Sequence, residues 1–371
     1  MPPGPSSWGR RPTVTPDPWE VGGEFHRVST PVGRFLAWPE AHRLYSLATY
    51  SVVALWRSLP AQSGRTLHAP DYFCPEVVEA WSRLGIPIRE YADDPRWTEP
   101  DWSSLTPRDG DVVVAVNLFG VRDGAAWSAW REAHPGGILV EDHSHDPRSR
   151  WARESTADYA FASLRKTLPI SDGAILWSPR GMSLPPPVEA EPASGSAIKF
   201  AGMILKAEYL AGYDDVDRET YRALQLRGEA DLLAGPPGAI SPWNLPLVTS
   251  GIPLRWRRRR EVNVRELLRL IGDRPEIRPL FETWPAGHCP FNAIVLFGSE
   301  RDRDSCRSRL IEHRIFAPVH WPQPRSASAR VREVAARLLT IPVDQRYGPA
   351  DVRRIAEVLA AFEPSHRGPA A

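Results

Sequence analysis

The sequence has few of the features that mark secreted, membrane-spanning or zinc-binding proteins. Its three cysteines, Cys74, Cys289 and Cys306, stand far apart and form no Cys-x-x-Cys pair, which argues against a disulfide framework or a zinc knuckle. No apolar run approaches the length of a membrane span, and no charged start followed by an apolar stretch marks a signal peptide. We therefore expect a protein of the reducing cytoplasm that has no membrane partner.

A charge imbalance is also lacking, since 46 basic and 45 acidic residues leave a net charge of +1. This balance produces no overall field toward nucleic acid or an anionic membrane, so neither is an expected partner. Lysine is nearly absent, and the only lysines are Lys166, Lys199 and Lys206. Because arginine cannot form a Schiff base, a lysine kept at a strand end of such a chain is a candidate for chemistry.

The order of apolar patterns predicts an α/β fold. With 371 residues, the chain is expected to form more than one domain. A helix is expected over 41–59, and strands and helices then alternate to residue 176. The clearest strand, Asp111–Asn117, is a valine run typical of a parallel sheet covered on both faces. A long arginine-rich helix over 255–271 precedes a second series, with strands at 291–297, 315–319 and 339–343.

These patterns predict a large, mostly parallel sheet domain followed by a smaller C-terminal α/β domain. The first residues, 1–22, are rich in proline, serine and glycine and are expected to be a disordered tail. The large domain is predicted over 23–254. The connector helix and small domain are predicted over 255–362, and a flexible tail over 363–371.

Two neighbouring strand ends carry most of the reactive side chains. The strand Ile138–Val140 leads into Glu141-Asp142-His143-Ser144-His145-Asp146, and the next strand ends at Ser163, three residues before Lys166. Ligands of open α/β sheets bind beyond the carboxyl ends of the strands. The sequence therefore predicts a site that contains Asp142, Ser163 and Lys166.

This layout resembles the cofactor centre of fold-type I pyridoxal 5′-phosphate (PLP) enzymes, and of the DegT-type sugar aminotransferases in particular. That family carries Glu-Asp-x-x-Gln or His, and residues 141–145 match it position by position. The resemblance implies that Lys166 forms the internal aldimine and later moves a proton at the substrate's α-carbon. It also implies that Asp142 faces the pyridine nitrogen, His145 lies near the ring hydroxyl and Ser163 donates to the phosphate.

Two shorter matches concern the phosphate and the ring. Ala48-Thr49-Tyr50-Ser51 resembles the family's Ser-Gly-Thr-Ala stretch, which implies that Thr49, Tyr50 and Ser51 hold the phosphate at a helix N-terminus. The alternative is the interior of a helix that starts near Ala41. Pro70–Pro75 occupies the segment that supplies the ring-stacking side chain, with Tyr72 and Phe73 as candidates and Cys74 nearest by strict count.

Two further stretches extend the resemblance along the chain. Asn117-Leu118-Phe119-Gly120 resembles the family's His-Leu-Tyr-Gly, which implies that Asn117 contacts the cofactor. His320-Trp321-Pro322 resembles its His-Tyr-x-Pro element near the active site. The resemblance covers roughly residues 40–362.

The expected substrate is a small molecule with an amino or carbonyl group. The spacing from Ser163 to Lys166 is shorter than in sugar aminotransferases, and Thr-Leu-Pro-Ile-Ser-Asp-Gly replaces their glycine-rich run. We therefore expect an aminotransferase-like reaction on a small amine or amino acid, with specialised metabolism as one setting. Elimination, racemisation and decarboxylation stay open, as does a PLP-fold protein that only binds or regulates, although Asp142 and Lys166 both count against the last.

A metal centre is the rival interpretation of the same cluster. Asp142, His143, His145 and Asp146 are all metal-ligand types at short spacing, and alternate residues of a strand share a face. A metal-dependent hydrolase could use His143 and His145 together. No distant cluster supplies the remaining ligands, however, and Lys166 would have no role, so PLP is the expected cofactor and no metal is expected.

The final expectation is a homodimer. In fold-type I enzymes the cofactor site lies at the subunit interface, and closed two-fold dimers are the commonest oligomers. The chain has 15 tryptophans, several in loop-like or proline-flanked settings, and interfaces are enriched in tryptophan and arginine. The tryptophans concerned are Trp151, Trp243, Trp284 and Trp321. The alternative is that they fill the cores of the two domains.

Overall fold

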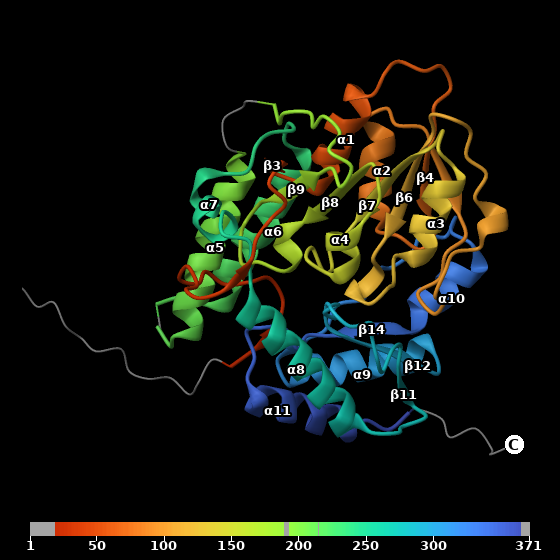
Figure 1. Ribbon diagram of the computed structural model, residues 1–371. Coiled ribbons are helices and arrows are strands. Elements are labelled where there is room, and N and C mark those ends of the chain that lie inside the picture. Colours follow the sequence, from red (N-terminus) through yellow and green to blue (C-terminus); the bar gives the residue numbers. More distant parts are fainter. Residues whose placement is uncertain (1–18, 189–192, 214, 365–371) are drawn as a thin grey trace, which may run out of the picture.

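The large domain is built on a seven-stranded sheet. The computed structural model describes residues 19–188, 193–213 and 215–364 (Figure 1). The strand order is β3-β9-β8-β7-β6-β4-β5, with β4 to β8 parallel and β3 and β9 antiparallel to their neighbours. The strands are β3 (His42–Tyr45), β4 (Leu67–Pro70), β5 (Ile88–Tyr91), β6 (Val112–Val116), β7 (Ile138–Asp142), β8 (Tyr159–Ser163) and β9 (Ala174–Trp177). The predicted mostly parallel sheet is confirmed.

Helices cover both faces of this sheet (Figure 1). Alternate residues of β6 show why its valines are needed: Val112 and Val114 pack in the same core as the helices of one face, whereas Val113 packs in the core of the other. A strand buried on both sides has no polar positions, as the sequence indicated. The helices are α1 (Ala48–Ser58) and α2 (Pro75–Arg83) on one face, and α3 (Ala125–Ala133) and α4 (Arg150–Glu154) on the other.

The helix predicted over 41–59 begins later than expected. Residues His42–Tyr45 form β3, which pairs antiparallel with β9 so that Leu44 lies opposite Ile175. The start near Ala41 is therefore wrong, because strand pairing at the sheet edge overrides the helical periodicity of the first residues. As a consequence, Ala48–Ser51 is the first turn of α1 and not a helix interior.

A helical hairpin follows the sheet. It consists of α5 (Ser194–Leu210) and α6 (Arg218–Ala234). Glycines let the two backbones touch: a Cβ on Gly195 would lie 2.4 Å from the Leu232 nitrogen, and one on Gly228 would lie 2.5 Å from the Lys199 nitrogen. No larger side chain fits there without moving the helices apart.

The C-terminal part forms a second, smaller core. The connector α8 (Leu254–Ile271) packs against α11 (Pro349–Ala360), with Val264, Leu267, Ile355 and Leu359 fully buried between them. An antiparallel sheet joins β11 (Ile277–Pro279), β12 (Ala293–Phe297) and β14 (Leu338–Ile341). Helix α9 (Glu300–Glu312) packs in this core, whereas α10 (Ala329–Arg337) packs in the core of the large domain. The short helix α7 (Leu245–Val248) and the strand β10 (Ile252–Pro253), which pairs with β2 (Phe35–Leu36), contribute to a third core with β8 and β9.

Part of the predicted N-terminal tail belongs to the fold. Residues 1–18 lie outside the described residues, as do 365–371 of the C-terminal tail, but Val21–Gly22 form β1. This strand pairs in parallel with β13 (Ile315–Phe316), which lies within the strand predicted over 315–319. The expected disorder is thus wrong for residues 19–22, because Val21 is fully buried in the core of the small domain.

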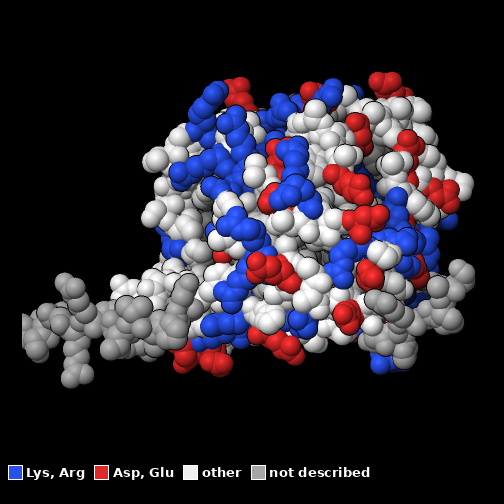
Figure 2. All heavy atoms as spheres, turned by 90° about the horizontal axis from the view of Figure 1, so that it is seen from below, with Lys and Arg blue, Asp and Glu red and all other residues white. Residues whose placement is uncertain are grey.

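The four tryptophans that were candidates for a dimer interface are buried or half-buried within the chain. Trp151 and Trp321 are buried in separate cores, and Trp243 and Trp284 are half-buried. They therefore give little support to an exposed aromatic interface, although the homodimer itself stays a prediction. Figure 2 shows charges of both signs on the face seen from below, with basic side chains gathered toward the left. Within the described ranges, no helix has the length and apolar character needed to cross a membrane.

Candidate active site

A cavity of about 300 Å³ lies where the central parallel strands end. The sheet register places Val116 of β6, Asp142 of β7 and Phe161 of β8 side by side, and all three line the cavity. Lys166 enters from the short helical turn Leu164–Lys166 that directly follows β8. The two strand ends singled out in the sequence therefore meet in one site.

Lys166 differs from the other two lysines in its partners. Lys199 pairs with Glu24 at 3.1 Å and Glu229 at 2.5 Å, and Lys206 pairs with Glu20 at 2.6 Å. Among the described residues, Lys166 makes no hydrogen bond or ion pair, and its Nζ lies 5.4 Å from the centre of a Trp321 ring. Among the described residues, Lys166 is thus the lysine whose amine has no carboxylate within ion-pair distance.

The Asp142 side chain is buried, and its carboxylate accepts a backbone hydrogen bond. Its Oδ1 accepts a hydrogen bond of 2.8 Å from the Ser144 backbone N–H. Burial raises the pKa of the Asp142 carboxyl, while hydrogen bonds from Ser144 and the positive charge of Lys166 oppose that rise. A cationic group in the cavity would favour the charged carboxylate.

His145 presents an unpaired donor. Its Nδ1 accepts a hydrogen bond of 3.0 Å from the Phe119 backbone N–H, so the neutral ring carries its proton on Nε2. That nitrogen is buried and has no partner among the described residues. Burial, together with the charge of Lys166, moves the pKa of His145 well below its usual range. A neutral His145 therefore lines the cavity with an N–H available to a ligand.

The first turn of α1 closes another side of the cavity. The backbone N–H groups of Tyr50 and Ser51 bond to the Leu47 carbonyl, so Ala48 and Thr49 carry the N–H groups that helix geometry leaves free. Ala48, Thr49 and Ser163 line the cavity. Free N–H groups at a helix N-terminus favour an anion such as phosphate.

Not every predicted contact reaches this cavity. Of the ring-stacking candidates Phe73 and Cys74 line it, whereas the Tyr72 hydroxyl donates to the His320 carbonyl. Three other predicted cofactor contacts are not brought to the cavity. Hydrogen bonds hold their side chains elsewhere: Tyr50 with the Gly235 carbonyl (2.6 Å), Ser51 with the Ala48 carbonyl (2.7 Å) and Asn117 with Ser149 (3.1 Å).

The structure also adds residues that the sequence did not assign. Trp321, which stacks on His145 with ring centres 5.8 Å apart, could have been found from the His320-Trp321-Pro322 motif. Arg165 and Lys199 both bond Glu229 at 2.5 Å on the cavity wall. Burial works in the opposite direction, but these two charges hold the pKa of Glu229 far below its usual range. No local sequence pattern indicates this network, because Lys199 lies on α5 and Glu229 on α6, and both helices are distant in sequence from Arg165.

The rival metal site does not assemble. The His143 Nε2 bonds the Glu141 carboxylate at 2.9 Å, and its ring stacks on Trp177, away from the cavity that His145 lines. Within the part of the chain that the structure describes, no group of three or more His, Cys, Asp or Glu side chains could hold a metal ion. His143 and His145 therefore do not act as the shared pair that a hydrolase would need.

Comparison with known proteins adds information on the fold. No protein-family model and no curated protein matches the sequence. Among solved structures, Helicobacter pylori PseC, an aminotransferase of pseudoaminic acid biosynthesis, is 12% identical with a TM-score of 0.59, covering 87% of each chain. The aminotransferase TlmJ from Streptoalloteichus hindustanus is 17% identical with a TM-score of 0.56, covering 86% of this chain and 85% of TlmJ.

A third similar structure was solved with the cofactor. The PLP form of Spr1654 from Streptococcus pneumoniae is 14% identical with a TM-score of 0.61, covering 93% of this chain and 98% of that one. Likenesses at such identities show the fold alone, and they confirm the fold class predicted from the sequence. The chain has the fold of fold-type I, PLP-dependent aminotransferases.

Proposed function

We propose that this protein is a PLP-dependent enzyme of aminotransferase type, a divergent relative of the DegT-type enzymes. The observation that carries the proposal is an unpaired Lys166 at a strand end, in one cavity with the buried carboxylate of Asp142. The two groups come from neighbouring parallel strands, whose register fixes their relation. A surface lysine or a capping aspartate would not require that arrangement.

The residues present fit the cofactor. Lys166 would hold it through its amine, and Asp142 would face its ring nitrogen. The orphaned Nε2–H of His145 suits the ring hydroxyl oxygen, and the free N–H groups of Ala48 and Thr49, with Ser163, suit the phosphate. When bound, PLP supplies an electron sink for a carbanion at the substrate's α-carbon.

The chain's own groups then have distinct tasks. The amine of Lys166, when not bonded to cofactor, is placed to take a proton from the substrate's α-carbon and to return it. Asp142 provides a fixed negative charge, and a buried, neutral His145 provides a donor that does not compete as a base. Phe73 and Trp321 line the cavity with apolar surface that excludes water and orients a planar ring.

The proposed substrate is a small amine or amino acid, or its carbonyl counterpart, and specialised metabolism is a proposed setting. The departures after Lys166 argue against a nucleotide sugar. Elimination, racemisation and decarboxylation would use the same groups, and product analysis would distinguish them. We also propose a homodimer in the cytoplasm, and sedimentation at micromolar concentration tests the dimer: an active, PLP-loaded monomer would refute it.

The direct test of the function is a spectrum of the purified protein with added PLP. We expect a visible absorption band that borohydride abolishes, because a bond between lysine and cofactor is reducible. A folded protein that shows no such band, and that binds no PLP by equilibrium dialysis, would contradict the proposed function.

A further inference from the structure

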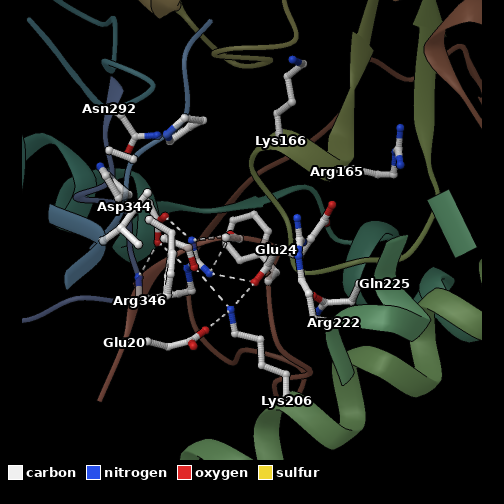
Figure 3. Close-up of a pocket in the computed structure, with 18 of the residues that line it drawn as sticks. Glu20, Glu24, Arg165, Lys166, Lys206, Arg222, Gln225, Asn292, Asp344 and Arg346 are labelled. Atoms are coloured by element: carbon white, nitrogen blue, oxygen red, sulfur yellow. Dashed lines mark hydrogen bonds and ion pairs between the residues drawn. The ribbon is translucent and has the colours of Figure 1, made fainter. Parts of the chain in front are cut away.

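A second cavity adjoins the first on the other side of Lys166. It has a volume of about 410 Å³ and lies between α6, residues 20–25 and the small domain. Glu24, Arg165 and Lys166 line both cavities. Figure 3 shows that Lys166 extends away from the ion pairs at the base of this second cavity. The cavity is therefore placed to hold the remainder of a molecule whose reacting end lies at Lys166.

Helix α6 turns a row of hydrogen-bond donors toward this cavity. Arg218, Arg222 and Gln225 stand four and three residues apart, which places them on one helix face, and all three line the cavity. Figure 3 shows Arg222 and Gln225 on this helix. Gln225 is only 1% exposed, and its Nε2 has no hydrogen-bond partner among the described residues. A buried donor without a partner is costly unless a ligand satisfies it.

The two arginines of this row are also poorly satisfied. Arg222 makes no hydrogen bond or ion pair within the described residues, although it lines the cavity. The Nε of Arg218 is buried without a hydrogen bond, and its ion pair to Glu20 is long, at 3.6 Å. Both guanidinium groups thus have unused donor capacity.

The other cations of the cavity fall into two groups. Lys206 pairs with Glu20 at 2.6 Å and Arg346 with Asp344 at 2.7 Å, so these positive charges are neutralised within the chain. Arg307, from α9 of the small domain, donates to the Ala317 carbonyl at 3.1 Å and has no carboxylate partner in the part of the chain that the structure describes. Among the described residues, the cavity therefore keeps positive charge without a carboxylate partner at Arg222 and Arg307, in addition to Lys166, while Arg218 has only the long pair to Glu20 that Lys206 shares.

We propose that the second cavity binds an anionic group of the substrate, a carboxylate or a phosphate. Arg222 and Gln225 of α6 hold it, with Arg307 on the facing small domain. The planar guanidinium fork matches the paired oxygens of both anions. The inference rests on the proposed function for the reacting end at Lys166 and specifies the substrate class: a small amine or carbonyl compound with an anionic group.

The test uses two amine-free anions, inorganic phosphate and glutarate, titrated calorimetrically into PLP-loaded protein. Wild type should bind at least one of them, and Arg222→Gln should weaken that binding by about tenfold or more, because a charge-assisted bond is lost. Gln225→Leu should weaken it by a smaller factor. Tighter phosphate binding indicates a phosphorylated substrate, and tighter glutarate binding indicates a carboxylate.

The matched control is Arg227→Gln, which makes the same charge change on the same helix. Arg227 is exposed, pairs with Asp231 at 3.7 Å and does not line the cavity, so binding should stay at the wild-type value. Arg222→Lys, which keeps the charge and loses the fork, should bind with intermediate affinity. Urea unfolding of each variant checks that it is folded.

Two outcomes would overturn the anion site: neither anion binds to wild type, or Arg222→Gln and Arg227→Gln bind alike. A failure of the proposed function is distinguishable, because it appears as a folded wild type that takes up no PLP. In that case the same titrations on the cofactor-free chain still decide whether Arg222 governs an anion site.

Discussion

The two cavities that meet at Lys166 are assembled in different ways. The first takes Asp142, Ser163 and Lys166 from the ends of adjacent parallel strands, so the sheet register alone brings them together. The second joins residues 20–25, α6, α9 and the stretch around Asp344, which are distant in sequence. The sheet thus positions the groups that we propose for the chemistry, whereas helix and domain packing positions those that we propose for recognition.

The largest expected effect is on stability, at the base of the second cavity. Glu20→Gln leaves Lys206 uncompensated in a site where both side chains are 3% exposed. We expect the free energy of unfolding, measured by urea denaturation, to fall by about 3–5 kcal/mol. Glu79→Gln, which breaks an exposed pair with Arg83, should cost less than about 1 kcal/mol. Equal effects of the two variants would contradict this prediction.

The first cavity should show the opposite pattern. Asp142→Asn keeps an oxygen for the Ser144 N–H and removes the charge, so the free energy of unfolding should change little. The turnover number should drop on the order of 10²-fold or more, because a fixed charge that stabilises the reaction is lost. Asp142→Glu should restore part of it. Undiminished turnover of Asp142→Asn would show that the assigned role is wrong.

Acid should lower the free energy of unfolding through His320, which lines the second cavity. Burial, helped by the charge of Lys166, lowers the pKa of His320 to about 3, whereas the unfolded chain has the ordinary value near 6.5. Between these values the unfolded chain binds the proton more readily, so stability is full above about pH 6.5 and is lost as the pH falls toward 3.

We expect this histidine to account for a loss on the order of 1–2 kcal/mol at pH 5, measured by urea unfolding at pH 7.5 and pH 5. His320→Gln should reduce the difference between the two pH values. An unchanged difference in the variant would assign the acid sensitivity to other groups, such as the half-buried His26, whose pKa is lowered to about 4 by its loss of contact with solvent.

The smallest effect is expected at the first turn of α1. Thr49→Val removes the hydroxyl of a residue that lines the first cavity and keeps the backbone N–H groups, which we propose as the main phosphate contacts. The affinity for PLP should fall by roughly two- to tenfold, as for one neutral hydrogen bond. Equilibrium dialysis measures this, and a loss of binding altogether would mean that the hydroxyl, and not the helix N-terminus, holds the phosphate.

Much of the first cavity could be predicted from the sequence. Asp142 and Lys166 were identified because each follows an apolar strand, and parallel strands end at one edge of a sheet. Thr49 was identified by resemblance. The true start of the helix, Ala48, was missed, because the residues before it pair as strand β3. These are features of local pattern and neighbouring strands.

The second cavity was not predictable from the sequence. Arg222 and Gln225 look like ordinary polar positions of a helix, and only the packing of α6 against residues 20–25 and the small domain shows that they face a cavity. Asn117, Tyr50 and Ser51 show the converse, because nearby hydrogen bonds turn side chains at matching positions away from the site.

The central claim is that Lys166, and neither of the two ion-paired lysines, carries the cofactor. Borohydride reduction of the PLP-loaded protein, followed by digestion and mass spectrometry of the peptides, tests it directly. We predict the pyridoxyl group on Lys166 alone. A modified Lys199 or Lys206 with an unmodified Lys166, or no modified lysine at all, would contradict the account.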